Sequence, residues 1–213
     1  MESKESGPVY WHHLYFAQGK TLALALTAAA MLSACAHSTP SFETSYEAVL
    51  VEEVERAEAF EPIPGSTPVP AVLYWNKYHG RKKYVGNGHC VKLVVDAVPA
   101  LGNTGTWARG THVYGDDSLE PGTPIATFDE SGAYGNHSRG LSHAALYVRQ
   151  SAAGLHVIDQ WRPTRKSRGQ RPRHRFIPWI GDRDTLPANT GVAFYVIHLL
   201  DSGERVIASE ADR

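Results

Sequence analysis

Cysteine is nearly absent from this chain of 213 residues, since Cys35 and Cys90 are the only two. This count excludes a framework of several spaced disulfides. Charge of one sign is also lacking: the net charge is −1 at pH 7. The chain as a whole therefore has no electrostatic basis for binding nucleic acid, and no nucleic-acid partner is expected.

Metal-binding motifs are missing as well, although the chain has eleven histidines. Catalytic zinc needs three protein ligands. The sequence contains no HExxH motif and no CxxC pair. We expect no metal and no cofactor.

The N-terminal region lacks an apolar run long enough to span a bilayer, which takes about 20 residues. Residues 21–31 form a shorter apolar stretch after Lys20, as in the core of a secretory signal. The stretch ends in LSAC, which resembles the lipobox of bacterial lipoproteins. This resemblance implies a signal peptide over residues 1–35 and lipidation of Cys35. Lipid chains on Cys35 would anchor the protein to a membrane. The alternative is a signal anchor or a buried helix with an incidental cysteine.

Location follows from the same resemblance. Ala36 is not the usual retention signal for the inner membrane, which favours the periplasmic side of the outer membrane. Residues 36–70 then form a tether with an acidic and proline-rich spacer.

The composition, 42% apolar and 20% charged, is typical of a globular chain with a core. We place that single domain at residues 71–213.

Within the domain, one helix is followed by several strands. Valines recur at helical spacing after Cys90, and Pro99 ends the pattern, which predicts a helix over 90–98. Apolar or alternating runs predict strands at 123–128, 143–150, 155–161 and 192–198. This order indicates an α+β fold, with the helix packed on a small antiparallel sheet.

Cys90 follows the turn GNGH and begins the predicted helix. A thiol at a helix N-terminus loses its proton more easily, because free N–H groups and the helix dipole stabilise the thiolate. A nucleophilic thiol also needs a base and a group that orients the base. The alternative is a buried structural cysteine.

His143 and Asp159 are the candidate partners. Strands 143–150 and 155–161 are joined by SAAG and form a predicted hairpin. If residues pair with index sums near 304, His143 and Asp159 are diagonal neighbours on one face. A register slip of one residue would move Asp159 to the other face.

The motif order is more specific than any single motif. GNGHCVKLVV, TGTWARG, GTPIATF, NHSRGLSHAALYV and GLHVIDQW follow one another between residues 84 and 161. This order resembles the papain-like cell-wall amidases of the CHAP and NlpC superfamily, most closely a small group of largely uncharacterised bacterial members. The resemblance implies a papain-like core with Cys90 as nucleophile, His143 as general base and Asp159 as the orienting residue.

It also implies the reaction and the partner. Amide bonds in peptidoglycan peptides, or between peptide and sugar, would be hydrolysed through a thioester on Cys90. His143 would move the protons, and the backbone N–H of Cys90 would contribute to the oxyanion hole. Trp107 and His137 are candidate substrate contacts, although packing is the stronger interpretation of Trp107.

Several alternatives stay open. His137 is a rival base because it lies in the same glycine-rich loop, and His89 is a weaker rival. The basic segment 162–175 is expected to be a solvated loop, with contact to anionic headgroups or to acidic wall groups as its functional reading. The whole protein could also be a wall-binding lipoprotein without catalysis, or an amidase toxin delivered to rival cells. A lipobox argues against the last.

Overall fold

The computed structural model describes residues 42–165, 168–181 and 186–200, with side chains from residue 45 onward. These residues all belong to one compact unit, Pro40–Arg213. The apolar stretch 21–31 and Cys35 lie outside the described residues. The signal peptide and the lipid anchor therefore stay predictions.

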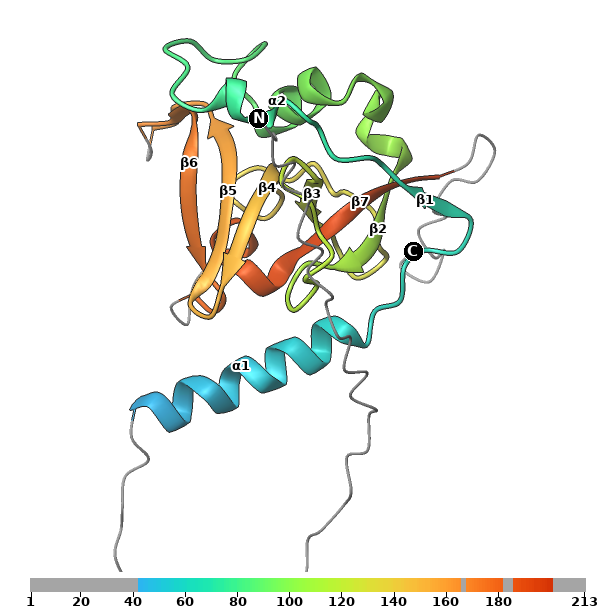
Figure 1. Ribbon diagram of the computed structural model, residues 1–213, viewed down its shortest axis with the longest axis vertical. Helices are drawn as coiled ribbons and strands as arrows, with labels where there is room; N and C mark the ends of the chain where they lie inside the picture. The colour runs from blue at the N-terminus through green and yellow to red at the C-terminus, as the bar shows by residue number, and fades with distance from the viewer. Residues whose placement is uncertain (1–41, 166–167, 182–185, 201–213) are drawn as a thin grey trace, which may run out of the picture. The chain divides into compact units, whose positions relative to one another are not determined.

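One antiparallel sheet forms the body of the protein (Figure 1). Its strand order is β1-β7-β3-β4-β5-β6, and β2 also pairs with β7. The strands are β1 (Ser66–Pro68), β2 (Trp107–His112), β3 (Pro124–Thr127), β4 (Ala144–Ser151), β5 (Gly154–Trp161), β6 (Gln170–Pro178) and β7 (Phe194–Leu200). Short 3₁₀ helices lie at Trp75–Tyr78, Pro99–Leu101, Thr104–Thr106, Pro187–Asn189 and Gly191–Ala193.

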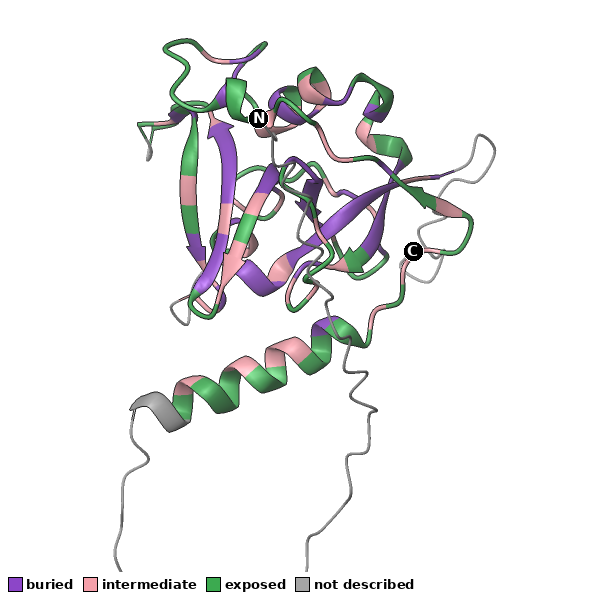
Figure 2. Ribbon diagram, in the orientation of Figure 1, coloured by how far each residue is buried: buried purple, intermediate pink, exposed green. Residues whose placement is uncertain are grey.

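Both faces of the sheet are buried at its centre, so β3, β5 and β7 are purple along much of their length in Figure 2. Along β4, successive side chains enter two different apolar clusters: Ala144 and Leu146 join one, while Ala145 and Tyr147 join the other. Side chains of a strand alternate between its two faces. Each face of the sheet therefore has its own core.

Helix α2 (Cys90–Ala97) covers the first of these faces. Leu93 and Val94 are fully buried in that cluster, and the valines at helical spacing surround them. The Val98 N–H still bonds to the Val94 carbonyl, and Pro99 then begins a 3₁₀ turn. The predicted helix is confirmed, and so is the α+β fold with a helix on an antiparallel sheet.

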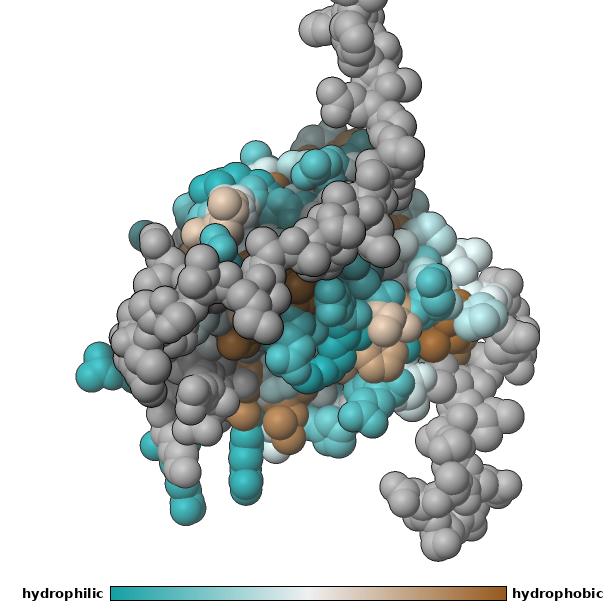
Figure 3. All heavy atoms as spheres, turned by 90° about the horizontal axis from the view of Figure 1, so that it is seen from below, coloured by the Kyte–Doolittle hydropathy of each residue, from teal (hydrophilic) through white to brown (hydrophobic). Residues whose placement is uncertain are grey.

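Helix α1 (Phe42–Glu58) packs against the second cluster. Leu50 and Val54 contact it, and the Tyr195 hydroxyl donates to the Ala57 carbonyl at 3.2 Å. Figure 3 views the molecule from below, which is the side on which α1 lies in Figure 1. The surface that is not grey in this view is largely hydrophilic, with scattered apolar residues. None of the helices in the described ranges combines the length and apolar character needed to cross a bilayer.

The four predicted strands are present within one or two residues as β3, β4, β5 and β7. Three strands were not predicted. β1 lies in the stretch interpreted as a proline-rich spacer. β2 lies in a stretch interpreted as irregular, and β6 lies where a solvated basic loop was expected. That expectation is wrong from residue 170 onward, because Gln170 and Pro172 turn inward while Arg171 and Arg173 stay exposed. The segment is an edge strand paired with β5.

Candidate active site

Cys90 is the first residue of α2, directly after a turn that only glycine fits well. Gly86 and Gly88 have φ values of +53° and +84°, a region that favours glycine. A Cβ on Gly88 would also lie 2.9 Å from Cγ of Arg162. The turn therefore brings the helix start close to the segment that follows β5.

Gln160 of β5 fastens this turn to the sheet. Its side-chain amide is buried and accepts a hydrogen bond from the Val85 N–H at 2.9 Å. It also donates to the Val85 carbonyl at 3.0 Å and to the His89 carbonyl at 2.8 Å. A buried amide that satisfies both sides of a turn fixes its position. Gln160 thus holds the residue directly before Cys90.

His143 precedes β4 and bonds to Asp159 of β5, with 2.8 Å between Nε2 and Oδ2. Both side chains are buried. The contact follows from the strand register, in which Leu146 pairs with Ile158 and Tyr147 with Val157. Both pairs have the index sum 304, so the predicted register is correct at this end of the hairpin. It shifts by one only farther along, after Tyr147.

Two residues of β6 complete the surroundings of Asp159. The Arg175 Nε donates to Oδ2 at 2.6 Å, and the Gln170 Nε2 donates to Oδ1 at 2.6 Å. The carboxylate is fully buried, so these donors and His143 offset the loss of water. Sequence reasoning missed both residues. The only signal was the polar–basic alternation after Gly169, which fits an edge strand.

The electrostatics of the site favour a charged Cys90–His143 pair. Burial opposes ionisation of the Cys90 thiol, but the charge and hydrogen bond of His143, with Tyr134 and the Ala144 backbone, lower its pKa to about 7. Burial also opposes protonation of His143, yet the Cys90 thiolate and the Asp159 carboxylate raise its pKa to about 9. Because Nε2 is engaged with Asp159, Nδ1 is the nitrogen left for the thiol.

Asp159 stays ionised in this setting. Burial would raise the pKa of its carboxyl group, but hydrogen bonding to His143 and the charge of Arg175 outweigh burial, and the net shift is downward. An ionised carboxylate on Nε2 holds the proton there and leaves Nδ1 free to accept one.

Tyr134 contacts the thiol from another side, with 3.7 Å between its hydroxyl oxygen and Sγ. Its ring packs against Trp107, with 5.0 Å between centroids. Trp107 itself is 1% exposed, and its indole N–H donates to the Leu101 carbonyl at 2.8 Å. Of the two interpretations of Trp107, this geometry favours packing over substrate contact.

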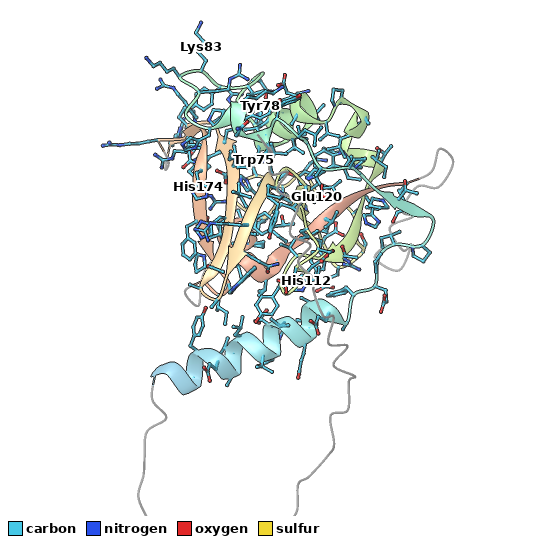
Figure 4. All side chains as sticks on the ribbon, viewed as in Figure 1. Trp75, Tyr78, Lys83, His112, Glu120 and His174 are labelled. Atoms are coloured by element: carbon cyan, nitrogen blue, oxygen red, sulfur yellow. The ribbon has the colours of Figure 1, made fainter. Side chains whose placement is uncertain are left out.

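The rival bases lie outside this arrangement. His89 and His137 are exposed. Both form hydrogen bonds through the backbone: the His137 N–H donates to the Ser142 hydroxyl, and the His89 carbonyl accepts from Gln160. His137 remains a candidate substrate contact only. Farther away, His174 stacks on His156, and His112 bonds to a backbone carbonyl (Figure 4).

The chemistry that this arrangement allows is nucleophilic. It combines a thiol of lowered pKa, a buried imidazole and a carboxylate that fixes the imidazole. Within the described ranges, no group of three or more His, Cys, Asp or Glu side chains is arranged to hold a metal ion.

Comparison with known proteins gives the site a family context. The family model of domesticated amidase effector 2 (Dae2) matches residues 70–197. A type VI secretion amidase effector 2 protein of Salmonella typhi is 43% identical over 79 residues, which are 37% of this chain and 57% of the relative. A domesticated amidase effector 2 of Ixodes scapularis is 36% identical over 80 residues, or 36% of this chain and 53% of the relative. The chain thus spans little more than half the length of these curated relatives.

A solved structure also matches. It is a type 6 secretion amidase effector 2 (Tae2), with a TM-score of 0.53 and 28% identity over 64% of this chain and 99% of that one. The predicted resemblance to papain-like amidases is confirmed at the level of the superfamily, whereas the CHAP and NlpC names are not those of the matched family. The matched residues include Cys90, His143 and Asp159 and cover more than half of the chain. The chain therefore belongs to the domesticated amidase effector 2 family.

Proposed function

We propose that this protein is a cysteine amidase that hydrolyses amide bonds of peptidoglycan. Cys90 is the nucleophile, His143 the general base and acid, and Asp159 the group that orients His143. The observation that carries the proposal is the buried 2.8 Å hydrogen bond from His143 to Asp159, on a histidine that also interacts with the Cys90 thiol. Family membership and the resemblance to cell-wall amidases support the substrate class.

The reaction has two halves. Nδ1 of His143 holds the proton of the Cys90 thiol, and the thiolate Sγ attacks the carbonyl carbon of the amide. The C–N bond then breaks, Nδ1 returns the proton to the leaving amine, and a thioester remains on Cys90. In the second half, Nδ1 takes a proton from water, which attacks the thioester. The carboxylic acid leaves, and the thiolate of Cys90 and the imidazolium of His143 are restored.

Two donors beside the thiol are candidates for the oxyanion hole. The backbone N–H of Cys90 is at the start of α2, where N–H groups lack a partner within the helix. The Tyr134 hydroxyl is 3.7 Å from Sγ. Donors fixed near the attacked carbonyl stabilise the tetrahedral intermediate.

The test is incubation of the full chain, with Cys35→Ser to leave one thiol, with purified muropeptides. Mass analysis of the products identifies the bond that is cut. We expect cleavage that Cys90→Ser abolishes and that Asp117→Asn, at an exposed position, leaves intact. Binding of muropeptides without any product, at every pH between 6 and 9, would instead favour a wall-binding protein without catalysis.

The location is a separate part of the proposal. The LSAC ending supports a periplasmic lipoprotein that is anchored to the membrane through Cys35. The relatives' names, which describe type VI secretion effectors, favour a second candidate: an amidase delivered to another cell. Labelling with radioactive palmitate separates them. Incorporation that Cys35→Ser abolishes supports the anchor, and its absence supports delivery.

A further inference from the structure

We propose that Arg175 is a positioning residue of this site, whose guanidinium fixes the Asp159 carboxylate behind His143 and ties it to residues 188–189. This inference rests on the proposed function. It adds to the site a member that comes from the edge strand β6 and does not touch the thiol or the substrate.

The first step is the shared oxygen. Nε of Arg175 and Nε2 of His143 both bond to Oδ2 of Asp159, at 2.6 Å and 2.8 Å. The ion pair of Arg175 and Asp159 is removed from water, since the two side chains are 15% and 0% exposed. A guanidinium is always charged and has a rigid geometry. It therefore keeps the carboxylate ionised and in one orientation.

The second step is the far end of the guanidinium. Its two terminal nitrogens donate to the Asn189 side-chain oxygen at 3.0 Å and to the Ala188 carbonyl at 2.9 Å. The Ala188 N–H in turn donates to the Gly140 carbonyl at 3.0 Å. Gly140 lies in the loop that leads to His143. Arg175 thus connects the carboxylate with the segment that delivers the imidazole.

The third step is charge. Asp159 and Arg175 form an ion pair with almost no net charge. The positive charge of Arg175 therefore partly offsets the negative potential that Asp159 produces at His143. Removing the cation would make the potential at both His143 and Cys90 more negative, and a more negative potential raises the pKa of each group. A residue that only supported the fold would lower stability and rate without moving the titration.

The experiment measures the rate at which iodoacetamide alkylates Cys90 between pH 5 and 10, in the full chain with Cys35→Ser. Iodoacetamide is uncharged, so the profile reports the thiolate. For Arg175→Gln we expect the midpoint to rise by about half to one pH unit. Arg175→Lys keeps the charge and should keep the midpoint. Arg171→Gln, an exposed change of the same charge on the same strand, is the matched control.

A second variant covers the case in which Arg175→Gln does not fold. Asn189 is exposed, and Asn189→Asp would place a competing carboxylate at the far end of the guanidinium. We expect a shift in the same direction, but smaller, because solvent screens the new charge. If Arg175→Gln folds, a midpoint that coincides with that of the parent overturns the inference. If it does not fold, the same result for Asn189→Asp does.

The two proposals fail in different ways. If His143→Ala leaves the alkylation profile unchanged, the thiol is not activated by the histidine and the proposed function fails. If His143→Ala removes the activation while Arg175→Gln leaves the midpoint in place, only the role of Arg175 fails.

Discussion

Two buried histidines of this protein each lie beside a hydroxyl or thiol, yet only one pair has the arrangement of a nucleophile and its base. His143 interacts with Cys90 and bonds to Asp159. His198 lies 3.1 Å from the Ser66 hydroxyl through Nδ1, and none of the described residues adds a carboxylate to it. Burial lowers the pKa of His198, whereas the pKa of His143 rises to about 9.

The direction of the proton is the second difference. The Ser66 hydroxyl donates to the Ile63 carbonyl at 2.5 Å, so its hydrogen points away from the histidine. It can only accept from Nδ1 of His198. The pair is therefore structural. The Cys90–His143 pair differs from it in having a carboxylate behind the ring and a free acceptor nitrogen in front of it.

Removing the thiol of Cys90 and the hydroxyl of Ser66 in separate variants should show the largest difference between the two pairs. Cys90→Ala should reduce muropeptide cleavage by at least about 10³-fold, because the covalent step is lost. Ser66→Ala should leave the rate near that of the parent and lower stability by about 1–2 kcal/mol, because the buried ring loses a partner. Product analysis and urea denaturation measure the two effects. Equal losses of activity would show that the two pairs are not distinct.

Asp159→Asn makes the active pair resemble the structural one. The variant keeps the shape of the side chain but removes its charge, so the imidazolium loses stabilisation and either tautomer can form. We expect the rate of cleavage to fall about 10²-fold or more. Stability should fall by about 3 kcal/mol, because Arg175 is left buried without its counter-ion. Asp117→Asn is the control, and a parent-like rate in Asp159→Asn would rule out the orienting role.

The pH dependence tests the pair without any mutation. The thiolate of Cys90 forms as the pH rises through about 7, and the imidazolium of His143 is lost as the pH rises through about 9. Both charged forms coexist only between these values, so the rate of hydrolysis should be highest there. It should fall about tenfold per pH unit on either side. A profile that keeps rising above pH 10 would contradict the need for an imidazolium.

Gln160→Ala should have a smaller effect than the changes at Cys90 and Asp159, and it tests how the thiol is positioned. The change leaves buried polar groups of Val85 and His89 without a partner, which costs about 1–3 kcal/mol of stability. We expect alkylation of Cys90 to slow by about tenfold, since a thiol displaced by even a small distance loses its geometry with His143. Gln150→Ala, a change of the same side chain that is removed from the site, should leave the alkylation rate unchanged.

Much of the site was predictable because its main parts are local. A glycine turn before an apolar run locates Cys90, and a short hairpin, in the register that holds at its far end from the turn, brings His143 to Asp159. The residues that hold these groups were not predictable in this way. Gln160, Gln170 and Arg175 look like ordinary polar residues of a strand or a basic loop. Their roles depend on which strand lies beside β5.

The same contrast holds for the fold. Alternating apolar residues reveal β3, β4, β5 and β7, since each contributes to a buried face. β6 does not show this pattern, because its exposed positions carry arginines and its buried ones are Gln170, Pro172 and Ile177. β2 was hidden because its second half, residues 110–112, has no apolar side chain and because its register with β7 is broken. The irregular edge strands were thus the parts that pattern reasoning missed.

β7 has a position in the sheet with a consequence for biosynthesis. Residues 194–200 are among the last described residues to be made, yet they pair with β1, β2 and β3 in the middle of the sheet. β3 in turn anchors the backbone of His143 through Thr127. We expect a nascent chain that has exposed Cys90 and His143, but not yet β7, to lack an assembled reaction centre.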